Sequence, residues 1–187
     1  MNTKDYNYTI KAVIVGEYGV GKSSILSRYC DNIYNDNYLC TIGADFYRKI
    51  IDLNGYQIKM HLWDTAGQEK YQALTPSYFR GAYVILLVFD LTNLASFKKL
   101  GKWMREVNGY KVVLIGNKSD LKNREVPQSY INEFISEYKV SYFETSARKD
   151  NNIVNLFSSI VSEFLTEIED YKTPKEVAID ETCSFCY

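Results

Sequence analysis

The sequence predicts a single α/β domain with a mostly parallel, six-stranded sheet, one antiparallel strand and helices on both faces. Residues 83–89 and 112–115 are continuous apolar runs, which are typical of strands buried on both faces of a parallel sheet. Residues 44–53 and 56–63 flank an Asn-Gly pair, the strongest short hairpin signal, so one antiparallel pair is expected. Strands and helical segments alternate along the chain, which indicates a doubly covered sheet.

The remaining elements follow in chain order and support this alternation. Residues 10–15 predict the first strand, a helix is expected from Ser24, and residues 142–143 belong to a short later strand. The last helix is predicted by apolar side chains at helical spacing: Ile153, Leu156, Phe157, Ile160, Val161, Phe164, Leu165 and Ile168. We therefore expect one globular domain over residues 1–171 and a flexible polar tail over residues 172–187.

Composition is that of an ordinary soluble globule and excludes several classes of function. The chain has 187 residues, 46% of them apolar and 24% charged, which is enough for one domain with a substantial core. Its net charge of −1 argues against general binding to nucleic acid. The longest apolar run, residues 82–89, is too short to cross a bilayer, and no secretion leader is expected. The four cysteines are not expected to form a disulfide framework. The single histidine, His61, has no obvious partner residues for Ser-His or Cys-His catalysis.

A phosphate-binding pattern follows the first predicted strand. Residues 16–23 read G-E-Y-G-V-G-K-S and match the P-loop pattern G-x-x-x-x-G-K-[ST]. Backbone N–H groups of such a loop point at phosphate oxygens, and the following helix adds its positive N-terminal end. Lys22 would bridge the β- and γ-phosphates, and the Ser23 hydroxyl would ligate Mg²⁺. The alternative is an accidental glycine-rich turn, which the strand–turn–helix context disfavours. The pattern predicts binding of a nucleoside phosphate.

The identity of the base is indicated by N-K-S-D at residues 117–120, after the predicted strand at 112–115. Open α/β sheets bind ligands at the carboxyl ends of their strands. The Asp120 carboxylate can accept two adjacent N–H donors, which guanine offers and adenine does not. The alternative is an ordinary polar loop, because loops that follow strands often have a similar sequence. However, T-S-A at residues 145–147 follows a third strand, where the Ala147 N–H would bond the guanine carbonyl oxygen. The sequence therefore predicts guanine.

These motifs resemble those of the Ras superfamily of small GTPases and, within it, the Rab family. The resemblance covers residues 9–171 and includes T-I-G-A-D-F at 41–46, W-D-T-A-G-Q-E at 63–69 and Y-F-R-G-A at 78–82. The first and last of these stretches look like Rab proteins rather than Ras, Rho or Ran proteins. The resemblance implies a P-loop GTPase domain that binds GTP and GDP with Mg²⁺, hydrolyses GTP and acts as a switch.

The resemblance also implies roles for individual residues. Thr41 would close on Mg²⁺ and the γ-phosphate, and Asp64 would hold the metal through a water, so the metal set is Ser23, Thr41 and Asp64. Gln68 would orient the attacking water, and the catalytic set is Gln68, Lys22 and Thr41. The nucleotide-binding set is Gly16, Glu17, Tyr18, Gly19, Val20, Gly21, Lys22, Ser23, Ser24, Tyr34, Tyr38, Thr41, Gly67, Asn117, Lys118, Asp120, Ser146, Ala147 and Arg148.

Two members of that set have more specific expectations. The Gly67 N–H would sense the γ-phosphate, a close approach that tolerates no side chain. Tyr34 would lie against the guanine edge, with the Lys118 stem covering a face of the base. The alternative for Tyr34 is an ordinary surface tyrosine, because the chain has 17 tyrosines.

Two features depart from the Rab pattern. Tyr18 occupies a P-loop position where Rab proteins usually carry a small residue beside the γ-phosphate, and bulk there tends to obstruct the arginine of a GTPase-activating protein. We expect slow intrinsic hydrolysis and weakened activation, unless the Tyr18 ring simply points to solvent. The connection between Trp103 and Lys111 is several residues shorter than usual in Rab proteins, so partner expectations for that face do not carry over.

Three aromatic residues, Phe46, Trp63 and Tyr78, are candidates for partner binding. In Rab proteins the matching trio forms an apolar patch between the switches that effectors bind, and Ile42 would lie in the same surface. The alternative is three core aromatics. Exposed apolar patches with polar surroundings usually mark partner sites. The implied partners are an exchange factor, a GTPase-activating protein and effector proteins, with the chain itself a monomer.

The tail ends in C-S-F-C-Y at residues 183–187. By resemblance to Rab proteins, Cys183 and Cys186 would carry two geranylgeranyl groups, anchoring the chain to the cytoplasmic face of an intracellular membrane, with a prenyl-carrier protein returning it to the cytosol. This spacing is neither a C-a-a-X box nor the usual cysteine pair, and no polybasic patch accompanies it. Free cytosolic thiols are the main alternative. A zinc site lacks further ligands, and a redox motif would be expected in a βαβ unit.

Three functions remain open from the sequence. The first is a GTP-hydrolysing switch in vesicle and membrane traffic. The second is a GTP-loaded binding scaffold that hydrolyses slowly and is soluble rather than membrane-anchored, which Tyr18 favours and Gln68 opposes. The third, a P-loop ATPase or kinase, conflicts with Asp120.

Overall fold

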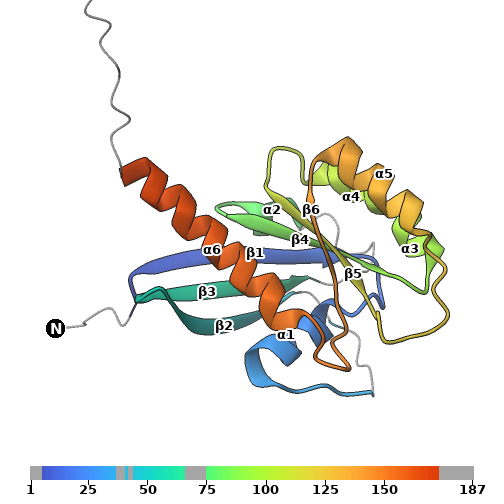
Figure 1. Ribbon diagram of the computed structural model, residues 1–187, viewed down its shortest axis with the longest axis horizontal. Helices are drawn as coiled ribbons and strands as arrows, with labels where there is room; N and C mark the ends of the chain where they lie inside the picture. Colours follow the sequence, from blue (N-terminus) through green and yellow to red (C-terminus); the bar gives the residue numbers. More distant parts are fainter. Residues whose placement is uncertain (1–5, 37–40, 42–43, 66–74, 173–187) are drawn as a thin grey trace, which may run out of the picture.

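The computed structural model describes residues 6–36, 41, 44–65 and 75–172. One six-stranded sheet runs through these residues in the order β2-β3-β1-β4-β5-β6, and helices lie on both of its sides (Figure 1). The strands are β1 (Tyr8–Gly16), β2 (Ala44–Leu53), β3 (Tyr56–Thr65), β4 (Val84–Asp90), β5 (Val112–Asn117) and β6 (Ser141–Glu144). The helices are α1 (Lys22–Asp31), α2 (Thr75–Phe79), α3 (Leu94–Lys98), α4 (Leu100–Glu106), α5 (Gln128–Tyr138) and α6 (Ile153–Lys172).

The strand pairing confirms the predicted mixed sheet. β1 pairs in parallel with both β3 and β4, and the parallel ladder continues through β5 to β6. Among the strands of the described residues, only β2 runs antiparallel, against β3. The hairpin between them turns at Asn54 (φ 52°) and Gly55 (φ 78°), two successive positive φ angles that Asn-Gly sequences adopt readily. The predicted α/β fold with a single antiparallel strand is therefore confirmed.

Two apolar clusters fill the space on the two sides of the sheet. One cluster joins alternate residues of β1 and β3 to α1 and α6, and it includes Ile14, Leu62 and Phe157. The other joins the opposite faces of β1, β4 and β5 to α4 and α5, and it includes Val13 and Trp103. β4 and β5 contribute to both clusters and are buried along their whole length, as their continuous apolar runs predict.

The observed element boundaries differ from the sequence expectations by one or two residues. β4 begins at Val84 rather than 83, and α1 begins at Lys22 rather than Ser24. The earlier start of α1 places the P-loop lysine in its first turn. α6 continues to Lys172, and the tail expected beyond it lies outside the described residues, as does the division into domain and tail.

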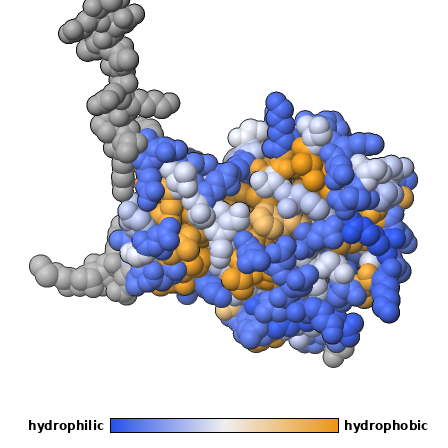
Figure 2. Space-filling model, in the orientation of Figure 1, coloured by the Kyte–Doolittle hydropathy of each residue, from blue (hydrophilic) through white to orange (hydrophobic). Residues whose placement is uncertain are grey.

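The surface drawn in Figure 2 is mostly polar, with hydrophobic side chains gathered in small separate areas. None of the helices that the structure describes is both long enough and apolar enough to span a bilayer.

Candidate nucleotide-binding site

The P-loop connects the carboxyl end of β1 to the start of α1, and two of its glycines have no room for a side chain. Gly16 has φ 139°, and a Cβ there would lie 2.2 Å from the Val88 carbonyl oxygen of β4. Gly21 has φ 94°, and a Cβ there would lie 2.4 Å from the Asn117 side-chain nitrogen. These close approaches require glycine at both positions, so the loop's conformation is set by its packing on β4 and β5.

Lys22 is buried beneath this loop. Its Nζ donates hydrogen bonds to the carbonyl oxygens of Gly16, at 3.0 Å, and Glu17, at 2.9 Å. The lysine charge is therefore held at the centre of the loop, where phosphate oxygens would be bound.

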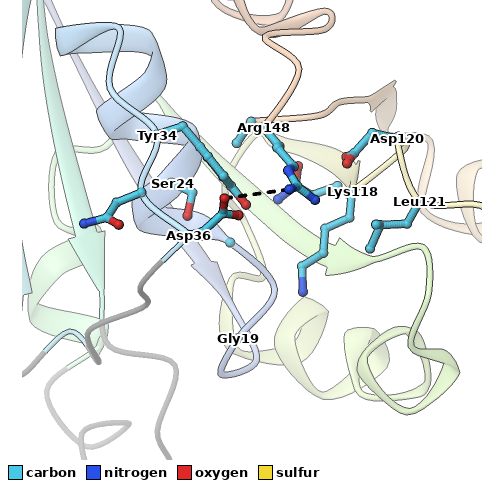
Figure 3. Close-up of a pocket in the computed structure, with 12 residues that line it drawn as sticks. Gly19, Ser24, Tyr34, Asp36, Lys118, Asp120, Leu121 and Arg148 are labelled. Atoms are coloured by element: carbon cyan, nitrogen blue, oxygen red, sulfur yellow. Dashed lines mark ion pairs between the residues drawn. The ribbon is translucent and has the colours of Figure 1, made fainter.

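A second group of residues encloses a pocket of about 280 Å³ beside the P-loop. Figure 3 shows Tyr34 and Asp36 on one side of this pocket, Lys118, Asp120 and Leu121 on the other, and Arg148 between them. The complete lining is Gly19, Gly21, Ser24, Tyr34, Asn35, Asp36, Asn117, Lys118, Asp120, Leu121, Ala147 and Arg148. The P-loop, the segment after α1, the loop after β5 and the loop after β6 thus meet at one pocket.

Asn117, at the end of β5, joins the loops of this pocket. Its side-chain Nδ2 donates to the Val20 carbonyl in the P-loop, at 2.9 Å, and its Oδ1 accepts from the Thr145 hydroxyl, at 3.2 Å. All three residues are buried. Because both ends of the amide are used, Asn117 fixes the distance between the phosphate-binding loop and the two loops beside the base pocket.

The two predicted base-contacting side chains are held by neighbouring loops. Asp120 Oδ1 accepts a hydrogen bond from the Ser146 hydroxyl, at 2.6 Å. The Lys118 ammonium lies 2.6 Å from Asp90 Oδ2 at the end of β4. Lys118 also has φ 67°, a left-handed conformation that a lysine adopts only where its surroundings enforce it. Both side chains are therefore positioned before any base is present.

Tyr34 and Arg148 border the other side of the pocket. Arg148 lies 3.7 Å from Asp36, which follows Tyr34 closely in the chain. Arg28 of α1 lies over the Tyr34 ring, 5.9 Å from its centre, and its Nε donates to the Ala147 carbonyl, at 2.9 Å. The guanidinium of Arg28 thus links the tyrosine segment to the loop expected to bind the guanine carbonyl.

Three oxygen-bearing side chains from three separate segments meet at the phosphate end. The hydroxyls of Ser23 and Thr41 lie 2.8 Å apart. Asp64 Oδ2 accepts from Ser23 at 2.5 Å and from Thr41 at 3.5 Å. Among the residues that the structure describes, the buried Oδ1 of Asp64 has no hydrogen-bond partner. Hard oxygen donors with one unsatisfied carboxylate oxygen fit a divalent cation such as Mg²⁺.

Burial raises the pKa of Asp64 to about 6, although the hydrogen bond from Ser23 and the charge of Lys22 oppose the increase. A buried carboxylate with a raised pKa is poorly compensated by the residues around it. A cation at this end of the site would supply the missing compensation.

Glu17 and Tyr18 are two further P-loop residues with predicted roles. The Glu17 carboxylate lies 2.6 Å from the Lys99 ammonium and accepts from the Trp103 indole at 3.3 Å, so it anchors the P-loop to α4. Tyr18 is 53% exposed. Glu17 therefore contributes its backbone rather than its side chain to the site, while the expectation that Tyr18 slows hydrolysis remains a prediction.

The predicted partner-binding trio forms a row of rings that runs from β2 through β3 to α2. The ring centres of Phe46 and Trp63 lie 5.1 Å apart, and those of Trp63 and Tyr78 lie 5.9 Å apart. Phe46 is 39% exposed, and the other two rings are half-buried. The trio is therefore neither fully in the core nor fully exposed.

Six residues with predicted roles lie outside the described residues: Tyr38, Ile42, Gly67, Gln68, Cys183 and Cys186. Conversely, the sequence did not single out Asp90 or Arg28, which hold the base-side loops in place. No motif marks either residue. Only the position of Asp90 at the carboxyl end of a predicted strand could have drawn attention to it.

Comparison with known proteins identifies the family. The Ras family model matches residues 11–166. The Ras-related protein RABE1d of Arabidopsis thaliana is 38% identical over 185 residues, covering 94% of this chain and 86% of the relative. The GTP-binding protein ypt1 of Schizosaccharomyces pombe is 38% identical over 159 residues, covering 82% and 78%. The Ras-related protein Rab-10 of Diplobatis ommata is 38% identical over 171 residues, covering 88% and 86%. The chain therefore belongs to the Ras family as a Rab small GTPase, a protein that binds GTP and GDP and hydrolyses GTP.

Proposed function

We propose that this GTPase is a Mg²⁺-dependent switch in vesicle traffic that recruits effector proteins while GTP is bound. The observation that carries the proposal is the convergence of the P-loop, the Ser23–Thr41–Asp64 oxygens and the Asp120 pocket along the carboxyl ends of the parallel strands. The relatives named as Ras-related and Rab proteins support the same assignment.

At the phosphate end, Ser23, Thr41 and Asp64 would hold Mg²⁺, which would supply positive charge that offsets the charge of the phosphates. Lys22 binds the β- and γ-phosphates, and the P-loop N–H groups orient them. The part assigned to Gln68 is to orient the attacking water in line with the γ-phosphate.

Switching follows from which contacts need the γ-phosphate. Thr41 and Gly67 would contact the γ-phosphate in the GTP state and would lose that contact after hydrolysis. Effectors that bind the trio of Phe46, Trp63 and Tyr78 then discriminate between the two states by their different affinities. An exchange factor and a GTPase-activating protein would set the rates of loading and hydrolysis.

The test is nucleotide turnover by the purified full chain. We expect tight GTP and GDP binding that ATP does not displace at comparable concentration, and Mg²⁺-dependent single-turnover hydrolysis that Gln68→Leu abolishes. Effective competition by ATP would overturn the assignment of guanine. Unchanged turnover in Gln68→Leu would overturn the role of Gln68.

The membrane part of the proposal depends on the tail. Two lipids on Cys183 and Cys186 would anchor the chain stably, whereas one would not. The C-terminal peptide of protein isolated from its native cells should carry isoprenoid mass on both cysteines, as measured by mass spectrometry. Unmodified cysteines would instead favour the soluble GTP-loaded scaffold.

A further inference from the structure

The outer face of the β2–β3 hairpin carries an unusual arrangement of basic side chains. The cross-strand pairs on this face are Phe46 with Trp63, Arg48 with His61, and Ile50 with Lys59. On β1, Lys11 is paired with His61. Arg48, His61 and Lys11 therefore form a transverse row on three adjacent strands, and Lys59 lies next to that row.

In this row two cations, Arg48 and Lys11, flank the His61 ring on the strands to either side. Burial, with the charges of Lys59 and Arg48, lowers the pKa of His61, so the ring is neutral near pH 7. Among the residues that the structure describes, no carboxylate forms an ion pair with Lys11, Arg48 or Lys59.

Each of these cations lies over an aromatic ring instead. The Lys11 ammonium is 5.2 Å from the Trp63 ring centre, the Arg48 guanidinium 6.0 Å from that of Phe46, and the Lys59 ammonium 4.7 Å from that of Tyr6. The Lys11 ammonium also donates to the Arg80 carbonyl oxygen, at 2.7 Å. An ammonium has three N–H donors and a guanidinium has five, so each of these cations keeps donors for a further acceptor. Within the described part of the chain, the face thus presents positive charge that no carboxylate pairs with.

Apolar side chains alternate with these charges along β2. Phe46 is 39% exposed and Ile50 is 51% exposed, and Arg48 lies between them on the same face. In the described part of the chain, the apolar cluster beneath α4 and α5 includes β1 and borders Trp63 but includes no residue of β2. Phe46 and Ile50 are therefore available to a partner.

We propose that this face, defined by Phe46, Arg48, Ile50, Lys59, His61 and Lys11, is the docking site for a polypeptide segment that carries carboxylates beside its apolar anchors. The proposal deepens the effector-binding function proposed above and rests on it. It assigns the chemistry of the partner: apolar side chains would contact Phe46 and Ile50, and Asp or Glu side chains would pair with Arg48, Lys59 and Lys11.

A polypeptide fits this face better than a lipid surface or a nucleic acid. Charged and apolar positions alternate at side-chain spacing, with about 7 Å between Phe46 and Arg48 and again between Arg48 and Ile50 along the strand. An anionic bilayer or a phosphate backbone would satisfy the cations but leave two exposed apolar side chains against charged headgroups or phosphates. A segment with alternating apolar and acidic side chains satisfies both.

The experiment selects partners without assuming their sequence. A displayed library of random peptides is selected on the full chain loaded with a non-hydrolysable GTP analogue. We expect enriched peptides to carry Asp or Glu next to large apolar residues. Selected peptides without acidic enrichment, or no selected peptides at all, would overturn the proposal.

Variants then test the face itself by fluorescence anisotropy with the best peptide. Arg48→Glu should weaken binding about tenfold and should favour a copy of the peptide with Lys in place of its acidic residues. Lys98→Glu on α3, which makes the same change of charge elsewhere, should have no effect. Equal binding by wild type and Arg48→Glu would contradict the proposal. A second assay measures sedimentation of the protein with phosphatidylserine vesicles. If Arg48→Glu abolished this sedimentation but left peptide binding intact, the face would bind lipid and the proposal would be wrong.

Nucleotide exchange and hydrolysis measured on the same variants separate this proposal from the proposed function. Normal turnover with no charge-dependent peptide binding would overturn only the docking site. Absence of guanine-nucleotide turnover in wild type would overturn the switch itself.

Discussion

The two halves of the nucleotide site differ in how their polar groups are satisfied. In the base half, Asp120 and Lys118 are fixed by Ser146 and Asp90, whose contacts leave the pocket open. In the phosphate half, Lys22 bonds P-loop carbonyls and the Ser23, Thr41 and Asp64 oxygens contact one another. Neither of these two contacts has to break for a base to enter, whereas phosphate and Mg²⁺ would replace some of the contacts in their half. The base half is thus organised for recognition and the phosphate half for a change of contacts.

The largest expected effect tests recognition by the base half. Asp120→Asn replaces a two-acceptor carboxylate with an amide that offers one donor and one acceptor, so it no longer matches the two N–H donors of guanine. We expect guanine-nucleotide affinity to fall by roughly 10⁴-fold, because a site built for a particular donor pattern rejects a mismatch strongly. Xanthine carries a carbonyl where guanine has its amine, so xanthosine diphosphate should bind the variant better than GDP does.

Asp52→Asn on β2 is the matched control for this prediction, because it makes the same chemical change at the far end of the hairpin. It should leave GDP affinity unchanged in the same competition assay. Equal GDP affinity in Asp120→Asn and Asp52→Asn would remove Asp120 from the base site.

A second prediction concerns the link between the halves. Asn117→Ala would leave the Val20 carbonyl and the Thr145 hydroxyl buried without their partner. We expect a loss of about 1–3 kcal/mol in the free energy of unfolding and faster GDP release, measured by urea unfolding and by displacement of a fluorescent nucleotide. Asn155→Ala, an exposed amide on α6, is the control. A loss of stability without faster release would show that the link does not couple the halves.

The third prediction addresses the phosphate half alone. Tyr18→Ser removes a large ring next to the expected γ-phosphate, so we expect single-turnover GTP hydrolysis to increase at least about threefold, with GDP affinity nearly unchanged. Tyr130→Ser, at an exposed tyrosine of α5, should leave the rate as it is. Equal rates in wild type and Tyr18→Ser would mean that the ring points to solvent without consequence, and the slow-scaffold alternative would lose its support.

Part of the nucleotide site could be predicted from the sequence, and part could not. The P-loop and N-K-S-D are contiguous patterns, and their residues do meet at one pocket at the ends of β1 and β5. The supports of that pocket come from ordinary residues far apart in the chain, such as Arg28 donating to Ala147 and Asp90 pairing with Lys118. Such pairings arise only from the packed fold, because neither residue type nor local spacing distinguishes them.

The fold could be predicted because its signals are also local in the sequence. Continuous apolar runs and an Asn-Gly turn are local consequences of burial and backbone conformation, so they predicted β4, β5 and the β2–β3 hairpin. The direction of the Glu17 side chain could not be predicted from the sequence. Its partners Lys99 and Trp103 lie more than 80 residues away, and the motif itself assigns no role to that position.

The smallest expected effect concerns the support of the base half. Glu144 immediately precedes the 145–147 loop and pairs with Arg124 at 2.8 Å. Burial alone would raise the pKa of Glu144, but hydrogen bonds from Arg124 and Tyr142 lower it overall. Because the pKa is depressed in the folded state, the pair stabilises the protein above the unfolded pKa of about 4.3 and loses that contribution as pH falls through the folded value. Both partners are partly exposed, so Glu144→Gln should lower the free energy of unfolding by only about 0.2–1 kcal/mol near neutral pH.

The test compares the urea midpoints of the variant and the wild type at two pH values. The midpoints should differ at neutral pH and converge at acidic pH. A constant difference at both would mean that packing, rather than charge, holds this side of the base pocket.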